Sequence, residues 1–151
     1  MSHLKRILGV NIPEIPQRDI LIVVNVLRIL TNFSRSSRLR VACVLWDSYE
    51  RNIVSLGYNG TEPGTDNTME LNNVTLDTVI HAEMNALQKI GRFRSRNLTC
   101  FITHSPCLKC AQELHRRGIH HVYYLENYRD HAGVNYLRKQ NILTTRLLII
   151  S

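Results

Sequence analysis

The chain of 151 residues contains no apolar run long enough to cross a membrane. A spanning helix needs about 20 consecutive apolar residues, and the longest candidate run, residues 20–30, is interrupted by Asn25 and Arg28. The amino terminus, Met1 to Arg6, lacks the apolar core and small-residue cleavage site of a secretory signal. We therefore expect a soluble, cytoplasmic protein without a membrane partner.

Internal repeats, low-complexity tracts and linkers are also missing, so nothing in the sequence divides the chain into parts. The composition, 44% hydrophobic and 21% charged, is typical of a globular protein and argues against disorder. A domain commonly has roughly 100–150 residues. We therefore expect a single domain, residues 1–151.

Acidic residues are scarce beside basic ones: 12 Asp and Glu stand against 19 Lys and Arg, which gives a net charge of +7. This excess favours anionic partners such as nucleotides or nucleic acid, although it specifies no site. A solvated basic surface is the alternative interpretation.

Only four cysteines are present, and paired disulfides are not expected in a reducing compartment. Cys43 and Cys100 lie inside apolar runs, so we interpret them as small core side chains. Cys107 and Cys110 instead follow Pro106 in polar sequence, and their close spacing is more typical of a metal site or of catalysis.

Hydrophobic periodicity and turn residues predict alternating helices and strands. Helices are expected at residues 16–34, 78–90, 107–117 and 133–140, and strands at 39–46, 52–58, 98–103, 119–125 and 142–150. Residues 59–75 contain Gly60, Pro63 and Gly64 but few large apolar side chains, so we expect a loop there. The order αββαβαβαβ predicts an α/β domain with a mixed five-stranded sheet and helices on both faces.

Two short motifs open the second and third predicted helices: His81-Ala82-Glu83 and Pro106-Cys107-Leu108-Lys109-Cys110. Cys107 and Cys110 are one helical turn apart, so their sulfurs can face the same point. His81 can supply a third ligand if the two helix starts lie side by side, and the positive helix N-termini would stabilise both thiolates. Three protein ligands leave the fourth position of a zinc ion open for water, which is the pattern of catalytic sites.

Glu83 follows His81 by two residues and is placed to take a proton from zinc-bound water and pass it to a leaving amine. The order His-x-Glu followed by Pro-Cys-x-x-Cys is the known signature of zinc nucleobase deaminases, in which the Glu is the acid/base and not a ligand. Two alternatives remain. One is a closed structural zinc with Glu83 or another His as fourth ligand, and the other is a pair of core cysteines.

Three segments together resemble the deoxycytidylate (dCMP) deaminases of the zinc-dependent cytidine deaminase superfamily. These are residues 81–86 (HAEMNA), 57–60 (GYNG) and 105–110 (SPCLKC), and Glu126-Asn127-Tyr128 adds to the likeness. The resemblance extends from about Ser34 to Ile142.

The resemblance implies a cytidine-deaminase-like fold and a hydrolase that acts on a cyclic amidine C–N bond. His81, Cys107 and Cys110 would bind Zn²⁺, and water activated there would attack C4 of cytosine, releasing ammonia and leaving dUMP. Glu83 would move the protons. The remaining substrate contacts would be the Ala82 backbone N–H with the pyrimidine O2, the Ser105 carbonyl with the departing amino group, Asn59 with the sugar 3′-oxygen, and Tyr128 against the nucleotide.

The resemblance also implies a basic site for the 5′-phosphate, where Arg gives a bidentate contact. The candidates are Arg35 and Arg38, for which a solvated loop charge is the alternative. Many dCMP deaminases are hexamers activated by dCTP and inhibited by dTTP, so we expect a homo-oligomer. Candidate effector or interface residues are Gly57, Tyr58, Gly60 and Arg92, the last beginning a cluster with Arg94 and Arg96.

Two residues depart from the pattern of these relatives. Ala42 stands where Gly is frequent, and His104 stands where a small or apolar residue is usual. His104 either touches the surroundings of the metal site or ends its strand. The segment 60–81 lacks the Cys/His insertion that carries a second zinc in some phage relatives, so we predict one zinc per chain.

The main hypothesis is therefore hydrolytic deamination of dCMP, a reaction of pyrimidine deoxynucleotide metabolism. A polynucleotide-acting tRNA adenosine deaminase is the first alternative, which the net charge of +7 allows and the GYNG segment opposes. A nucleotide-binding zinc module without activity is the second, and the presence of Glu83 with all three ligands opposes it. Salt dependence tests the first alternative, because binding through several phosphates weakens steeply with salt.

Overall fold

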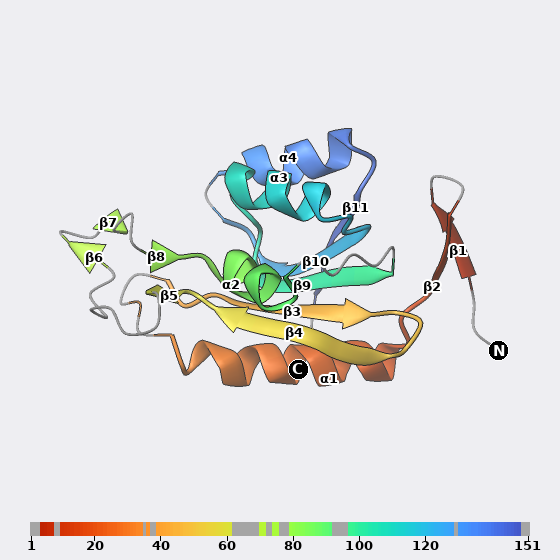
Figure 1. The fold of residues 1–151 in the computed structure, drawn as a ribbon, viewed down its shortest axis with the longest axis horizontal. Coiled ribbons are helices and arrows are strands. Elements are labelled where there is room, and N and C mark those ends of the chain that lie inside the picture. The colour runs from red at the N-terminus through yellow and green to blue at the C-terminus, as the bar shows by residue number, and fades with distance from the viewer. Residues whose placement is uncertain are drawn as a thin grey trace.

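A mixed five-stranded sheet organises the chain (Figure 1). The computed structural model describes residues 4–7, 10–34, 36, 39–61, 70–71, 74–75, 79–91, 97–128 and 130–148. The order across the sheet is β11-β10-β9-β3-β4. Its strands are β3 (Ala42–Asp47), β4 (Asn52–Tyr58), β9 (Leu98–His104), β10 (His121–Glu126) and β11 (Leu143–Arg146). The pairs β3–β4 and β3–β9 are antiparallel, whereas β9–β10 and β10–β11 are parallel.

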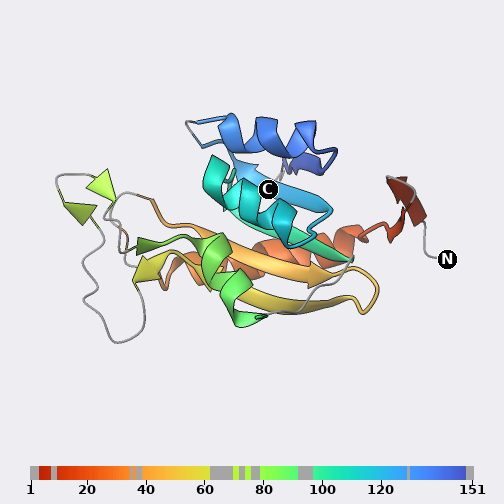
Figure 2. The same cartoon turned by 45° about the horizontal axis from the view of Figure 1, so that its top comes forward.

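In the part of the chain that the structure describes, four helices cover the sheet, one on one face and three on the other (Figures 1 and 2). They are α1 (Gln17–Thr31), α2 (Ala82–Lys89), α3 (Leu108–Arg116) and α4 (Ala132–Lys139). Helix α1 lies alone on its face, and α2, α3 and α4 lie on the opposite face. The predicted α/β domain with a mixed five-stranded sheet is confirmed.

The buried strand β3 shows why both faces are covered. Every residue of β3 is buried, and successive side chains of a strand point to opposite faces. Cys43 and Leu45 pack with α2, α3 and α4, whereas Val44 and Trp46 pack with α1. A strand that is apolar on both faces needs a helix layer on each side.

The second predicted helix starts later than residue 78, which corrects that boundary. Helix α2 begins at Ala82, because β8 (Val79–Ile80) pairs with β5 (Gly60–Thr61) as a short antiparallel ladder. The predicted loop 59–75 contains β5 and a second small ladder, β6 (Glu70–Leu71) with β7 (Val74–Thr75). Strands of two residues have no periodicity for sequence reading to detect.

An antiparallel pair precedes α1 and was not expected from the sequence: β1 (Leu4–Ile7) with β2 (Val10–Pro13). Both views place this pair and the β6–β7 pair at opposite ends of the molecule, away from the sheet (Figures 1 and 2). The last strand, predicted at 142–150, is β11 and ends at Arg146. Across the described ranges, no helix combines the length and the apolar character needed to cross a membrane.

Candidate active site

The topology brings four chain segments to one edge of the sheet. Strands β4, β9 and β10 all run in the same direction, since β3 is antiparallel to β4 and to β9. Their carboxyl ends therefore meet, followed by Asn59, Ser105 and Tyr128 respectively. The amino end of β3 reaches the same edge with Val41. Ligand pockets of open α/β sheets commonly lie at the carboxyl ends of strands.

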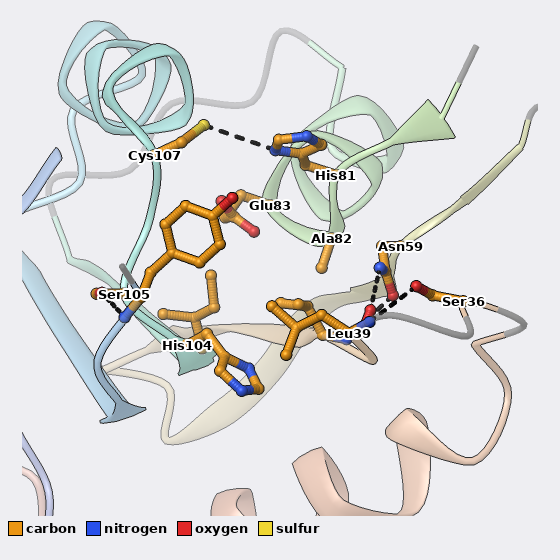
Figure 3. A pocket seen from close by; sticks show the side chains of 12 residues that line it. Ser36, Leu39, Asn59, His81, Ala82, Glu83, His104, Ser105 and Cys107 are labelled. Carbon is orange, nitrogen blue, oxygen red and sulfur yellow. Dashed lines mark hydrogen bonds between the residues drawn. The ribbon is translucent and has the colours of Figure 1, made fainter. Parts of the chain in front are cut away.

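Two helix starts converge beside this edge. His81 is the N-cap residue of α2 and Cys107 that of α3, and both have extended backbone angles, ψ of 155° and 167°. Neither side chain forms a capping hydrogen bond with its own helix, so both can turn toward the space between the two helix starts. The side chains of His81 and Cys107 face each other across the gap between the helices (Figure 3).

The predicted metal ligands form a cluster. His81 Nδ1 lies 3.6 Å from Cys107 Sγ and 3.3 Å from Cys110 Sγ, and one ligand atom from each residue lies within 4.8 Å of the others. Tetrahedral zinc, with Zn–N and Zn–S bonds of about 2.0–2.3 Å, places two such ligands roughly 3.6–3.8 Å apart. The donor set and its spacing therefore fit a zinc ion with one position left open.

Hydrogen bonds among the two thiols and the imidazole shift the pKa values of all three groups. A hydrogen bond with the Cys110 thiol lowers the pKa of Cys107 to about 4, so Cys107 is a thiolate at neutral pH. The same contact and burial raise the pKa of Cys110 far above its ordinary value. The hydrogen bond with Cys107 raises the pKa of His81. A metal ion must therefore displace the proton of Cys110 when it binds.

Glu83 is the buried carboxyl of the site. Its side chain is 3% exposed and belongs to the first turn of α2, next to the metal cluster (Figure 3). Burial raises the pKa of Glu83, against the opposing effect of a hydrogen bond with Cys110. A carboxyl whose pKa is raised accepts a proton more readily and can return it within one reaction cycle.

A pocket connects these groups with the strand ends. Its cavity volume is about 200 Å³, and it is open to solvent on one side. The residues lining it are Ser36, Leu39, Val41, Asn59, His81, Ala82, Glu83, Ile102, His104, Ser105, Cys107 and Tyr128. Two of the three metal-ligand candidates, His81 and Cys107, belong to its lining, so the pocket lies directly against the metal cluster.

The side chain of Asn59 is largely occupied within the protein. Its Oδ1 accepts hydrogen bonds from the Ser34 hydroxyl at 2.6 Å and the Val41 backbone N–H at 3.0 Å, and its Nδ2 donates to the Leu39 carbonyl at 2.8 Å. Asn59 thus fastens Ser34, Leu39 and Val41 to the end of β4. Among the described residues, nothing accepts the second N–H of its amide group, so this N–H is left for a ligand in the pocket.

The other expected contact residues also line the pocket. Ala82 is buried at the start of α2. The Ser105 hydroxyl accepts a hydrogen bond from the Tyr128 backbone N–H at 2.7 Å, and the Ser105 N–H donates to the Glu126 carbonyl at 2.9 Å. Those bonds hold the segment after β10 against the segment after β9, which keeps Tyr128 at the pocket wall.

The candidate effector or interface residues of the GYNG segment, Gly57, Tyr58 and Gly60, each contact a different part of the protein. Gly57 is buried, and a Cβ atom there would lie 2.6 Å from the Ala82 carbonyl and 2.7 Å from the Ala86 nitrogen. Its role here is therefore to let α2 pack closely on β4. The ring of Tyr58 is half-buried and stacks on Phe33 with ring centroids 6.0 Å apart, while Gly60 pairs with Ile80.

The remaining expected residues, Arg35, Arg38, Arg92, Arg94 and Arg96, lie outside the described residues. Several pocket residues were not selected from the sequence as ligand contacts, namely Ser36, Leu39, Val41, Ile102 and His104. Of these, His104 carried a usable signal, because it precedes the Ser-Pro-Cys motif directly. It does end its strand, and it also lines the pocket.

Comparison with known proteins identifies the family. Residues 19–126 match the family model described as the cytidine and deoxycytidylate deaminase zinc-binding region. The chain belongs to this family. The predicted zinc cofactor is thereby confirmed, and the cluster of His81, Cys107 and Cys110 offers the donors for it.

This chain is identical to each of two curated relatives at about a third of the aligned positions. It is 30% identical over 97 residues to ComE operon protein 2 of Bacillus subtilis (strain 168), covering 60% of this chain and 51% of that protein. It is 37% identical over 101 residues to a probable deoxycytidylate deaminase of Caenorhabditis elegans, and this match covers 62% of this chain and 50% of that protein. The chain thus spans about half the length of these relatives.

Among solved structures, it resembles the dCMP deaminase of the cyanophage S-TIM5 in complex with dCMP and dUMP. The TM-score is 0.82 with 26% sequence identity, and the match covers 89% of this chain and all of that one. The apo form of the same phage enzyme matches with a TM-score of 0.75.

Proposed function

We propose that this deaminase-family chain catalyses the hydrolytic deamination of dCMP to dUMP, with release of ammonia. The observation that carries the proposal is the meeting of the His81, Cys107 and Cys110 cluster with the buried carboxyl of Glu83 in one pocket. The likeness to a phage dCMP deaminase that binds dCMP and dUMP supports this choice of substrate.

His81, Cys107 and Cys110 would hold the zinc ion at the inner wall of the pocket. When bound, zinc acts as a Lewis acid that brings the pKa of water to about 7 and so supplies a nucleophile at neutral pH. Glu83 accepts the proton of that water on its carboxylate and later donates it to the amino group that leaves C4. Burial favours the protonated carboxyl between these two steps.

The remaining pocket groups orient the nucleotide. The Ala82 backbone N–H at the start of α2 would donate to the pyrimidine O2, and the Ser105 carbonyl would accept from the departing amino group. The second side-chain N–H of Asn59 would donate to the sugar 3′-oxygen, because its Oδ1 and its other N–H already form hydrogen bonds within the protein. Tyr128 would pack against the nucleotide, and Arg35 or Arg38 would contact the 5′-phosphate.

A homo-oligomer, in the form of a hexamer, is part of the proposal. Exposed apolar side chains on α1 and directly after it support this part: Ile22 and Ile29 of α1 are 45% and 59% exposed, and Phe33, two residues beyond the helix, is 59% exposed. Activation by dCTP and inhibition by dTTP, with Arg92 and its neighbours as contacts, remain predictions, as does a cytoplasmic location. Light scattering with and without each nucleotide measures both the assembly and its response.

A substrate panel tests the proposed reaction. Zinc-loaded protein is given dCMP, deoxycytidine, CMP and a tRNA anticodon hairpin, and deamination is followed by loss of absorbance and by mass spectrometry. We expect turnover of dCMP, with a kcat/KM that varies little with salt compared with that of a polynucleotide substrate. Turnover of the hairpin without turnover of dCMP would contradict the proposal.

A further inference from the structure

His104 is a pocket residue to which the proposed reaction gives no role. It is the last residue of β9, its side chain is half-buried, and it lines the pocket together with Leu39 and Asn59. Figure 3 shows its imidazole next to Leu39 and well away from His81 and Cys107. It therefore belongs to the part of the pocket that lies away from the metal cluster.

A hydrogen-bond chain determines which nitrogen of His104 carries a proton. The Ala42 backbone N–H donates to Thr103 Oγ1 at 3.1 Å, and this oxygen lies 3.0 Å from His104 Nδ1. Thr103 is buried, and leaving its hydroxyl proton unpaired would be unfavourable by about 1–3 kcal/mol. The hydroxyl therefore donates to Nδ1, its one available acceptor in the part of the chain that the structure describes.

This arrangement makes His104 a neutral donor. With Nδ1 accepting from Thr103, the proton of a neutral imidazole resides on Nε2. Burial favours that neutral form by lowering the pKa of His104, against the opposing charge of Glu126. The Glu126 carboxylate is itself paired with Arg146 at 3.2 Å. Nε2–H has no partner among the described residues, so a ligand can accept it.

The orientation of a bound nucleotide indicates which ligand atom that is. The amino group on C4 must lie at the metal cluster and Glu83, and the sugar is attached to N1, across the pyrimidine ring from C4. The sugar and its 5′-phosphate must therefore extend away from the cluster, toward the wall where Asn59, Leu39 and His104 lie. Phosphate oxygens are the strongest acceptors that a nucleotide offers there.

We propose that His104 is a specificity-determining residue, which donates Nε2–H to an oxygen of the 5′-phosphate and so favours dCMP over deoxycytidine. The inference rests on the proposed function, because it takes a nucleoside 5′-monophosphate as the substrate. Thr103 is a positioning residue in this arrangement, since it acts only through the ring of His104.

The test compares three substitutions that differ in what they can donate. H104L removes every donor, H104N offers an N–H at about the position of Nδ1, and H104Q offers one at about the position of Nε2. For H104L and H104N we expect kcat/KM for dCMP to fall roughly 10- to 100-fold, mainly through KM. H104Q should recover most of that loss, and kcat/KM for deoxycytidine should change by less than about threefold in all three.

Zinc content and thermal midpoint, measured for each variant, identify any that fails to fold, and the Gln–Asn comparison does not depend on the Leu variant. Equal losses for dCMP and deoxycytidine would show a merely structural role and overturn the proposal, as would equal activity of H104Q and H104N. Binding of dCMP to zinc-loaded E83Q protein, measured by calorimetry, distinguishes failure of the proposed function from failure of the proposed role of His104. If wild-type protein does not turn over dCMP and E83Q protein does not bind it, the proposed function is overturned, and the role of His104 with it.

Discussion

At the residue scale, the proton arrangement of the metal cluster has a consequence for zinc binding. Cys107 has a pKa of about 4, whereas the pKa values of Cys110 and His81 are raised by their contacts with Cys107. A group whose pKa is raised holds its proton more firmly, and zinc must displace that proton. Zinc affinity should therefore weaken as the pH falls, and zinc uptake at neutral pH should release protons.

Calorimetry in buffers of different ionisation enthalpy measures this release. We expect at least about one proton per zinc at pH 7, from the Cys110 thiol. C110S protein provides the control, since it lacks the thiol that must lose its proton and should release fewer protons while binding zinc more weakly. Zinc uptake without proton release would contradict this description of the cluster.

At the scale of elements, two glycines allow close packing against the helix starts that carry the metal ligands. Gly57 of β4 lies against the Ala82 carbonyl at the start of α2. A Cβ atom on Gly133 of α4 would come even closer to the Pro106 carbonyl and would lie 2.8 Å from the Cys107 carbonyl, both at the start of α3. A side chain at either position would push a helix start away, and with it His81 or Cys107. The positions of the metal ligands therefore depend on packing between neighbouring elements.

A substitution at Gly57 tests this dependence. The Cβ of G57A would meet backbone atoms at 2.6 and 2.7 Å, which cannot move without shifting α2. We expect G57A to lower the free energy of unfolding by about 1–3 kcal/mol, the usual range for overpacking, and to reduce zinc affinity. Urea unfolding and zinc titration measure the two effects.

Gly60 offers a matched control in the same segment. Nothing lies within 4 Å of a Cβ built there, so G60A should change the free energy of unfolding by no more than a few tenths of a kcal/mol. Equal stability of G57A and G60A would show that α2 can adjust freely and that its close approach to β4 does not position His81.

The elements also show what a sequence can predict. The spacing of Cys107 and Cys110 is a local helical property, so the sequence alone is enough to recognise it. The start of α2 is not such a property, because Val79 and Ile80 continue an apolar pattern and only pairing with Gly60 and Thr61 makes them a strand. Local periodicity does not report such pairing between distant segments.

The same limit applies to the pocket. The contacts of Asn59 with Ser34, Leu39 and Val41 join residues at least 18 positions apart. No sequence pattern indicates that three of its amide contacts are already made within the protein. His104 was visible as a departure from the family pattern, but its place on the pocket wall follows only from the fold.

At the scale of the whole molecule, the sheet collects the site from distant parts of the chain. Asn59 follows β4, the metal motifs begin α2 and α3, and Tyr128 follows β10, yet all of them reach one pocket. This convergence is possible because β4, β9 and β10 run in the same direction, so their carboxyl ends lie at the same edge of the sheet. The chemistry thus depends on the complete sheet rather than on any one motif.

The most direct test of the central claim compares zinc content and dCMP turnover in wild-type, E83Q and E113Q proteins. Glu113 is the matched control, because it pairs with Arg116 on α3 and does not line the pocket. We expect all three proteins to bind equal amounts of zinc. E83Q alone should lose activity, by at least about 100-fold, which is the usual contribution of a positioned acid/base group. An E83Q protein with full zinc content and more than about a tenth of wild-type turnover would contradict the proton-transfer role of Glu83 and the mechanism built on it.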